Sequence, residues 1–167
     1  SKIEELISKY CPNGVESVPL GDLLDYEQPT RYIVKSTRYR DNGTPVLTAG
    51  QTFVLGYTSE TDGIFKASTD NPVIIFDDFT TDSKLVNFPF KVKSSAMKIL
   101  QVRTGIEIEY VSMFMSVTRL IGDTHKRYWI SEYSKLEIPI PPLAEQKRII
   151  DAVHAAFAKL DAIMESL

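Results

Sequence analysis

Cysteine and histidine are scarce in this sequence. Its 167 residues include one cysteine, Cys11, and two histidines, His125 and His154. A single cysteine excludes an intramolecular disulfide framework, and so few nitrogen and sulfur ligands argue against a zinc site made of protein side chains. We therefore predict no metal site and a reducing, cytoplasmic environment.

Long hydrophobic runs are also missing. The longest purely apolar stretches, such as residues 73–76, are far shorter than the roughly 18 residues that suggest a membrane span. Hydrophobic residues nevertheless make up 43% of the chain, which is enough to bury a core without disulfides or metals. We expect one compact soluble domain with an appendage and no contact with a membrane.

The motifs of a DNA methyltransferase are absent as well. Such an enzyme needs a glycine-rich turn between strand and helix for its cofactor, and an Asn- or Asp-Pro-Pro-aromatic tetrapeptide for the flipped base. The nearest match, Asn71-Pro72-Val73-Ile74, lacks the second proline and the aromatic residue, so we interpret it as a turn that leads into a strand. The sequence predicts no cofactor.

The net charge of −3 hides an uneven distribution. Residues 1–28 carry two basic and six acidic side chains, residues 29–135 carry fourteen and eleven, and residues 136–167 carry three and five. Surfaces that bind nucleic acid usually show an excess of Lys and Arg. The net charge therefore argues against DNA binding, whereas the mildly basic middle of the chain permits it.

Turn residues divide the middle of the chain into short β-rich runs. These runs, each bounded by Gly, Asn, Asp, Pro or Ser, cover residues 46–48, 52–58, 64–65, 73–76, 88–92 and 97–102. Further strands are indicated at 128–130 and 136–140, and helical spacing at 3–10, 18–25 and 107–120. We predict an α+β fold, with a twisted, mostly antiparallel, β-rich domain and a long C-terminal coiled-coil helix.

The C-terminal helix has the strongest periodic signal. Pro139, Pro141 and Pro142 form a stiff exit that cannot be helical, and no Gly or Pro follows them. Heptad a and d positions, counted from Leu143, are apolar except for one glutamine. They are Leu143, Gln146, Ile150, Val153, Phe157, Leu160, Met164 and Leu167. A helix over 143–167 would be about 37 Å long at ~1.5 Å per residue.

Two arrangements account for the apolar stripe of this helix. The helix could fold back on its own domain, as amphipathic helices commonly do. It could instead pair with another chain, parallel or antiparallel, and the proline-stiffened exit favours this arrangement because it directs the helix away from the domain. The expected homodimer contacts are Ile150, Val153, Phe157, Leu160, Met164 and Leu167.

Two basic clusters have the composition of a DNA-contacting surface. The first, residues 30–40, interleaves four basic side chains with two tyrosines, and the second, residues 125–129, reads His-Lys-Arg-Tyr-Trp. Such mixtures contact phosphates and groove edges, although an ordinary solvated surface has the same composition. We assign phosphate or base contact to Arg31, Lys35, Arg38, Arg40, Lys84, Lys126 and Arg127. Possible base reading is assigned to Thr37, Gln51, Thr80 and Thr81.

An acidic loop offers the enzymatic alternative. Residues 82–84, Asp-Ser-Lys, imitate the acid-x-Lys end of a metal-dependent nuclease site, in which carboxylates hold Mg²⁺. The site would use Asp77, Asp78, Asp82 and Lys84. The spacing counts against it, because such sites usually take their first acid from an earlier element. The competing interpretation is a polar loop that meets DNA.

A longer motif at the domain exit resembles a known family. Residues 138–150 read IPIPPLAEQKRII, which combines a proline-stiffened exit, a Glu-Gln pair and the start of a heptad helix. This segment resembles the one that closes each target-recognition domain of type I restriction-modification specificity subunits and opens the following spacer helix. HKRYWISEYSKLEIPIP and CPNGVESVPLGDLL are similar to the same family, so the resemblance covers essentially the whole chain.

The resemblance implies a non-catalytic subunit that binds one half of a split target in double-stranded DNA, while methyltransferase and restriction subunits perform the chemistry. It implies a target-recognition domain over 1–142 and a spacer and dimerisation helix over 143–167. Specificity subunits carry two such domains in tandem, whereas this chain has one, so a self-paired chain should read an inverted repeat. The remaining alternative is a coiled-coil protein-interaction module that never meets DNA.

Overall fold

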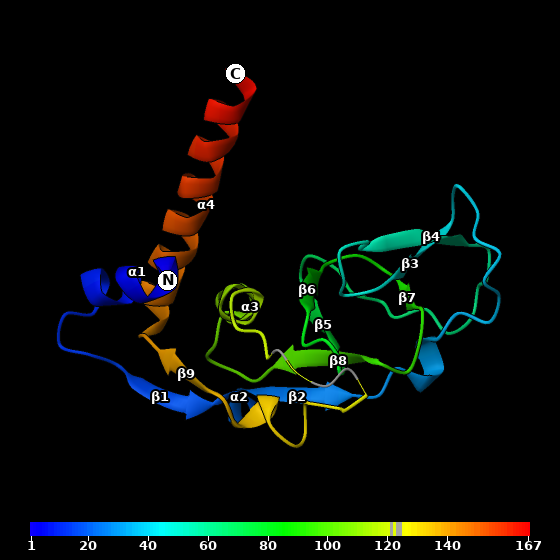
Figure 1. Ribbon diagram of the computed structural model, residues 1–167, viewed down its shortest axis with the longest axis horizontal. Helices are drawn as coiled ribbons and strands as arrows, with labels where there is room; N and C mark the ends of the chain where they lie inside the picture. The colour runs from blue at the N-terminus through cyan, green and yellow to red at the C-terminus, as the bar shows by residue number, and fades with distance from the viewer. Residues whose placement is uncertain (121, 123–124) are drawn as a thin grey trace.

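An antiparallel sheet with strand order β2–β8–β5–β6 forms the centre of the molecule (Figure 1). The computed structural model describes residues 1–120, 122 and 125–167. The strands of this sheet are β2 (Leu24–Glu27), β8 (Met97–Val102), β5 (Val73–Asp77) and β6 (Ser83–Val86). Successive side chains of a strand point to opposite faces. Because hydrophobic cores cover both faces, residues 73–76 of β5 are all buried.

The first core lies between one face of this sheet and the helices α1 (Lys2–Tyr10), α3 (Ile108–Ser116) and the start of α4 (Leu143–Glu165). A capping box between Ser1 and Glu4 begins α1. Phe76 of β5 packs against the rings of Trp129 and Tyr133, with centroids 5.3 and 4.8 Å away. This aromatic group anchors the segment before β9 to the sheet.

The second core joins the other face of the sheet to a smaller sheet with strand order β4–β3–β7. Its strands are β3 (Thr44–Leu47), β4 (Val54–Thr58) and β7 (Lys91–Val92). The β3–β4 pair is antiparallel and the β3–β7 pair is parallel. Buried Leu47 and Phe90 meet Val73 and Ile75 of β5 in this core, so β5 contributes alternate side chains to both cores.

Strands from near the two ends of the chain pair with each other. β1 (Glu16–Pro19) and β9 (Glu137–Ile140) form an antiparallel ribbon. Short helical turns lie nearby: α2 (Leu20–Leu23), η1 (Thr30–Tyr32) and η2 (Tyr133–Lys135). The ribbon brings α1 beside the base of α4, and the rest of α4 rises away from the domain (Figure 1). No helix within the described ranges is long and apolar enough to cross a membrane.

The predicted α+β class, the mostly antiparallel sheets and the long C-terminal helix are confirmed. The runs at 73–76 and 97–102 become β5 and β8. The helical turn expected within residues 18–25 is present at 20–23, between two strands. Two other assignments were wrong in extent: residues 64–65 form only an isolated bridge from Phe65 to Phe90, and the helix predicted over 107–120 ends at Ser116.

The strand predicted at 128–130 is absent from the described structure, which has a turn there. The N–H groups of Tyr128 and Trp129 are both bound by the Asp78 carboxylate. The Tyr128 N–H also donates to the Asp78 carbonyl at 2.8 Å. Because both donors are directed at Asp78, they are not available for a ladder with a neighbouring strand. Strands β1, β2 and β6 were not predicted, since each is short and carries exposed or half-buried residues.

Candidate nucleic-acid interface

The turn between β5 and β6 is shaped by Asp77 and Thr81. The Asp77 carboxylate accepts hydrogen bonds from the N–H groups of Phe79 (2.8 Å) and Thr80 (3.1 Å). The Thr81 N–H donates to the Asp77 carbonyl at 2.9 Å. Thr81 has a φ of 62°, a left-handed conformation that is uncommon for a β-branched residue. These bonds hold the turn in one conformation.

Asp78 is in the same turn, but its side chain is buried. Its Oδ1 accepts hydrogen bonds from the N–H groups of Tyr128 (3.1 Å) and Trp129 (2.7 Å). Its Oδ2 lies 3.5 Å from Nζ of buried Lys98 and 3.5 Å from the Arg127 guanidinium. A buried carboxylate requires such partners because an unpaired charge is costly away from water. Asp78 therefore fixes the second basic cluster against the turn.

Further contacts join the turn to the segment after α3. The Leu120 N–H donates to the Thr81 hydroxyl at 2.9 Å. The Arg119 guanidinium lies 2.9 Å from the Asp82 carboxylate. The β5–β6 turn, residues 77–82, is thus bound both to residues 119–120 and to residues 127–129. These neighbours belong to a part of the chain that lies far from the turn in sequence.

The region formed by the β5–β6 turn and the residues bound to it carries polar side chains that face solvent. Lys84 on β6 is exposed, and Thr80 is partly buried at the turn. The Arg127 side chain is 50% exposed, and its guanidinium lies 4.9 Å from the centroid of the Phe79 ring. A guanidinium that stacks on a ring keeps donors free for phosphate or base edges. The geometry suits contact with a nucleic-acid backbone.

The carboxylates of the acidic loop are committed to protein partners. Asp77 binds the N–H groups of its own turn, Asp78 pairs with Lys98 and Arg127, and Asp82 pairs with an arginine. Among the described residues, no group of three or more His, Cys, Asp or Glu side chains could hold a metal ion. This geometry favours a polar loop over the nuclease alternative.

Glu60 organises the first basic cluster. Its carboxylate accepts hydrogen bonds from the N–H groups of Lys35 and Ser36, each at 3.1 Å, and from the Lys91 Nζ at 2.7 Å. The Lys91 side chain is 1% exposed. The bond from Lys91 lowers the pKa of Glu60, and the backbone N–H groups act in the same direction, against the effect of burial. Glu60 thus ties this cluster to β7.

The end of the first basic cluster lies along β4. Arg40 and Tyr57 exchange backbone hydrogen bonds of 2.8 and 3.1 Å. Tyr39 lies so close to Gly56 that a Cβ on this glycine would be 2.4 Å from the Cβ of Tyr39. The absence of a side chain at Gly56 therefore permits this approach, and it leaves Arg38 and Arg40 exposed at the edge of the smaller sheet.

Most of the predicted contact residues are exposed. The exposed members are Arg31, Lys35, Thr37, Arg38, Arg40, Gln51, Lys84, Lys126 and Arg127. Lys35 pairs with Asp62 at 2.8 Å, and Lys126 pairs with Glu132, so part of their charge is already balanced. Thr81 departs from the prediction: it is fully buried and its hydroxyl is bound inside the fold, so it cannot meet a base edge.

The structure brings together two of the predicted groups. Residues 80–84 and 126–127 meet through Asp78, whereas residues 31–51 belong to the part that carries the smaller sheet. Sequence reasoning missed Lys66 and Lys93, exposed cations of that part, because each stands alone beside strand residues. It also missed the organising role of the buried Asp78 carboxylate, because an aspartate in a turn is usually exposed to solvent.

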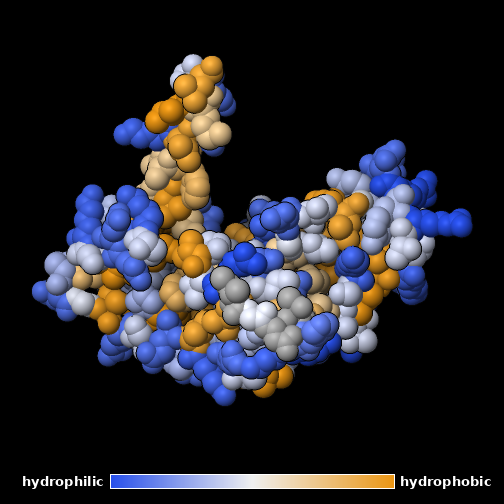
Figure 2. Space-filling view, viewed as in Figure 1, coloured by the Kyte–Doolittle hydropathy of each residue, from blue (hydrophilic) through white to orange (hydrophobic). Residues whose placement is uncertain are grey.

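The apolar stripe of α4 is divided into two halves. Ile149, Ile150 and Val153 are buried against the first core. Beyond them the stripe is uncovered, with Phe157 and Met164 61% and 62% exposed. Hydrophobic residues run along the projecting helix in the space-filling view (Figure 2). The fold-back arrangement therefore holds for the first half of the stripe, and the second half is not covered by the domain.

The predicted dimer contacts Ile150 and Val153 need correction, since they pack within their own domain. They do so because the spacing that suits a coiled coil also suits the groove between α1 and α3. The exposed members of the predicted set are Phe157, Leu160, Met164 and Leu167.

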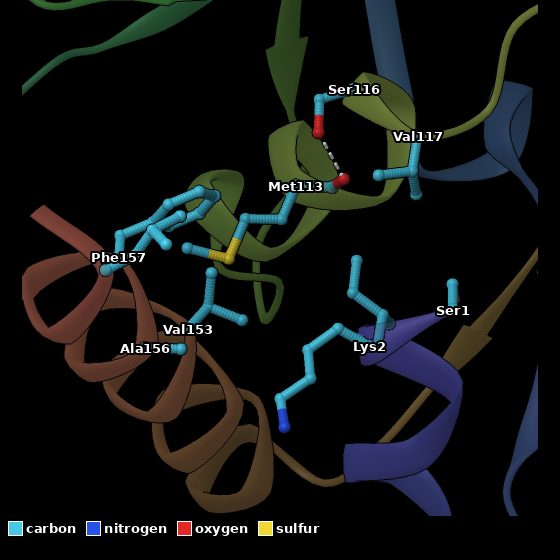
Figure 3. A pocket seen from close by; sticks show the side chains of 10 residues that line it. Ser1, Lys2, Met113, Ser116, Val117, Val153, Ala156 and Phe157 are labelled. Atoms are coloured by element: carbon cyan, nitrogen blue, oxygen red, sulfur yellow. Dashed lines mark hydrogen bonds between the residues drawn. The ribbon is translucent and has the colours of Figure 1, made fainter. Parts of the chain in front are cut away.

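An apolar groove marks the point at which α4 leaves the domain. It has a volume of about 300 Å³ and lies between α1, α3 and α4. Met113 of α3 points toward Val153 and Phe157 of α4, with Lys2 of α1 on the opposite side (Figure 3). The groove therefore continues the exposed stripe down to the domain surface.

Comparison with known proteins identifies the family. Residues 12–167 match the family described as "Type I restriction modification DNA specificity domain". The chain is 48% identical over 163 residues to the EcoR124I/EcoR124II type I restriction enzyme specificity subunit of Escherichia coli, covering 89% of this chain and 40% of that protein. The chain thus spans less than half the length of this relative.

Solved structures with low sequence identity share the fold. The HsdS subunit of Thermoanaerobacter tengcongensis has a TM-score of 0.60 at 16% identity, and the S subunit of M. genitalium has 0.64 at 11%. Each alignment covers 98% of this chain and 44% of the other. The family match spans nearly all of the fold described above, from the end of α1 through α4. This chain therefore belongs to the DNA specificity domains of type I restriction-modification systems.

Proposed function

We propose that this chain reads one half of a split DNA target, without catalysis of its own, while methyltransferase and restriction subunits do the chemistry. The observation that carries the proposal is the solvent-facing surface that Asp78 builds from the β5–β6 turn and the second basic cluster. A rigid arrangement of donors is what sequence reading requires. This role places the protein with the DNA in the cytoplasm.

The proposed contacts combine the two exposed regions. Phosphate or base contact is proposed for Arg31, Lys35, Arg38, Arg40, Lys84, Lys126 and Arg127, and base reading for Thr37, Gln51 and Thr80. The arginines are expected to contribute most to DNA binding, because their paired donors match guanine edges and phosphates. Lys35 and Lys126 should contribute least, since each already has an acidic partner.

We further propose that two copies pair through α4. Residues 1–142 would form the DNA-reading domain and residues 143–167 the spacer helix. The support is the uncovered half of the stripe, Phe157, Leu160, Ile163, Met164 and Leu167. Exposed apolar residues in continuous array favour association. Two identical domains related by a two-fold axis would read an inverted repeat.

A duplex titration at fixed salt tests the contacts. In the presence of the methyltransferase subunit, Arg38→Ala and Lys84→Ala should each weaken binding and reduce the slope of log affinity against log salt by about 0.9. Lys9→Ala on α1 is the matched control, since it removes one exposed charge away from the proposed surface. Equal affinities for all three variants and the native chain would contradict the assignment.

Selection from random duplexes tests the function itself. With the methyltransferase subunit present, the native chain should enrich one sequence as an inverted repeat. An interaction module that never meets DNA would enrich none. Incubation of the pure chain with duplex and Mg²⁺ tests the nuclease alternative, because only a nuclease would cut DNA unaided.

A molecular-mass measurement tests the pairing. The native chain should have the mass of a dimer, and Leu160→Glu should have that of a monomer, because a charge in an apolar seam is costly to bury. Far-ultraviolet circular dichroism should show that the variant remains folded, since Leu160 lies outside the first core. A monomeric native chain would contradict the proposed homodimer.

A further inference from the structure

One polar side chain is buried at the base of α4. Gln146 lies in the first turns of the helix and is 1% exposed. Its Oε1 accepts a hydrogen bond from the Glu107 N–H at 3.0 Å, and its Nε2 donates to the Pro141 carbonyl at 2.8 Å. Both ends of the amide are therefore satisfied by backbone groups.

These two bonds join three elements at one point. Glu107 is the residue that precedes α3 and has no side-chain cap of its own. Pro141 lies between β9 and α4, and Pro142, the N-cap residue of α4, likewise makes no side-chain capping bond. Gln146 thus supplies polar partners where the ends of α3, β9 and α4 meet.

Two weaker contacts lie on the same side of the helix. The Lys147 Nζ is 3.8 Å from a Glu107 carboxylate oxygen, and His154 Nε2 is 3.2 Å from Glu109 Oε1. Both pairs are partly exposed and therefore add little by themselves. Together with the buried amide they join α4 to residues 107 and 109 at the start of α3.

Apolar packing alone does not fix the direction of a helix closely. Ile149, Ile150 and Val153 bury α4 against the domain, but the hydrophobic free energy of this burial has no directional preference. Hydrogen bonds weaken when they bend. A small rotation near Pro142 would be amplified along the projecting helix, so bonds at this pivot control where its far end lies.

We propose that Gln146 is a positioning residue that sets the direction of α4 and thereby the spacing at which two paired domains meet DNA. The second half of this statement rests on the proposed function, whereas the first half does not. Replacement by Leu keeps the side chain of similar size but removes both polar ends, so it leaves the Glu107 N–H and the Pro141 carbonyl without this partner. The pivot must then move to give both groups other partners.

Pulsed electron-spin distance measurement tests the direction of the helix. Spin labels are attached at Gln101→Cys on β8 and Lys159→Cys on α4, both exposed, in a Cys11→Ser background. Dilution into excess unlabelled protein leaves only the distance within one chain. The native Gln146 should give one narrow distribution, and Gln146→Leu should give a broader or displaced one. Gln28→Leu, at an exposed glutamine, should leave the distribution unchanged.

A broad distance distribution from the native chain would overturn the proposal, and this outcome does not depend on any variant folding. If Gln146→Leu folds and gives the same distribution as the native chain, the proposal is also overturned. Gln146→Glu provides a second variant, because a carboxylate keeps the acceptor for the Glu107 N–H but has no donor for the Pro141 carbonyl. It should also widen the distribution. Circular dichroism confirms that each variant is folded.

Selection from random duplexes, again with the methyltransferase subunit, tests the consequence for DNA. Gln146→Leu should enrich the same half-site bases as the native chain, with a changed or wider range of spacings between them. Unchanged spacing would overturn the link from Gln146 to spacing. A native chain that enriches no sequence would instead contradict the proposed function, without altering the distance result.

Discussion

At the scale of single residues, buried charges organise the surfaces that face solvent. Asp78 binds two N–H groups of the second basic cluster, and Glu60 binds two of the first. Each carboxylate is paired with a lysine that is 1% exposed, Lys98 and Lys91 respectively. The sequence composition identified the basic clusters but not the two carboxylates that hold them in place, because an acidic residue beside a turn is usually solvated.

Replacing Asp78 tests its structural role. Asp78→Asn should lower the free energy of unfolding by about 3–5 kcal/mol, because Lys98 would remain buried without its counter-charge. Asp82→Asn, which removes a carboxylate whose partner Arg119 is largely exposed, should cost about 1 kcal/mol or less. Urea denaturation followed by tryptophan fluorescence measures both. Equal losses would show that burial of the first pair is not decisive.

The Glu60 pair should make stability depend on pH. The pKa of Glu60 is lowered in the folded state by Lys91, so the folded protein holds this proton less tightly than the unfolded chain. The stabilisation is complete above the ordinary pKa of 4.5 and is lost as the pH falls through the folded value. Glu60→Gln should reduce the dependence of unfolding free energy on acid pH, whereas Glu165→Gln at the exposed end of α4 should not.

At the scale of elements, α4 shows what heptad spacing can and cannot predict. The spacing predicted the start of the helix at Leu143 and its apolar stripe. It could not separate residues that pack within the domain from those left exposed, because both uses need the same periodicity. Ile149 lies outside the a and d positions and is nevertheless fully buried, since α1 and α3 cover more of the helix than a single partner helix would.

Truncation of side chains should reveal the two halves of α4. Ile149→Ala should destabilise the domain by about 2–5 kcal/mol because it leaves a cavity in the first core. Leu160→Ala should change the unfolding free energy by less than about 0.5 kcal/mol under dilute, monomeric conditions, since half of its surface is already exposed. Chemical denaturation at low protein concentration measures both changes. A large loss for Leu160→Ala would mean that the domain covers this residue.

Strands were predictable where they are buried on both sides. β5 is a continuous apolar run over residues 73–76, and β8 is mostly apolar apart from Lys98 and Gln101, because each face of the central sheet carries a core. β1 and β2 gave no such signal, since most of their side chains are exposed or half-buried. Their positions are determined by partners, β9 and β8, that lie far away in the sequence. Local pattern contains no information about those partners.

At the scale of the whole molecule, the two cores share one sheet. Ile74 and Phe76 belong to the first core, and Val73 and Ile75 belong to the second. Neither core can lose β5 and remain packed. The parts of the molecule that carry the two basic clusters should therefore unfold together, even though each has its own apolar interior.

A comparison of probes tests this coupling. Trp129 reports on the first core, and an environment-sensitive label at Lys66→Cys, in a Cys11→Ser background, reports on the part with the smaller sheet. The two denaturation curves should superimpose, as expected of a two-state transition. Separate midpoints would show that the cores are independent.

The β1–β9 ribbon also affects how the protein is made. Glu16 pairs with Ile140, so a ribosome must synthesise most of the chain before the first strand meets its partner. Until then the nascent segment has an unsatisfied edge that other chains can join. Closure over so long a loop is slow compared with local contacts. Folding should therefore finish only after β9 has left the ribosomal exit tunnel.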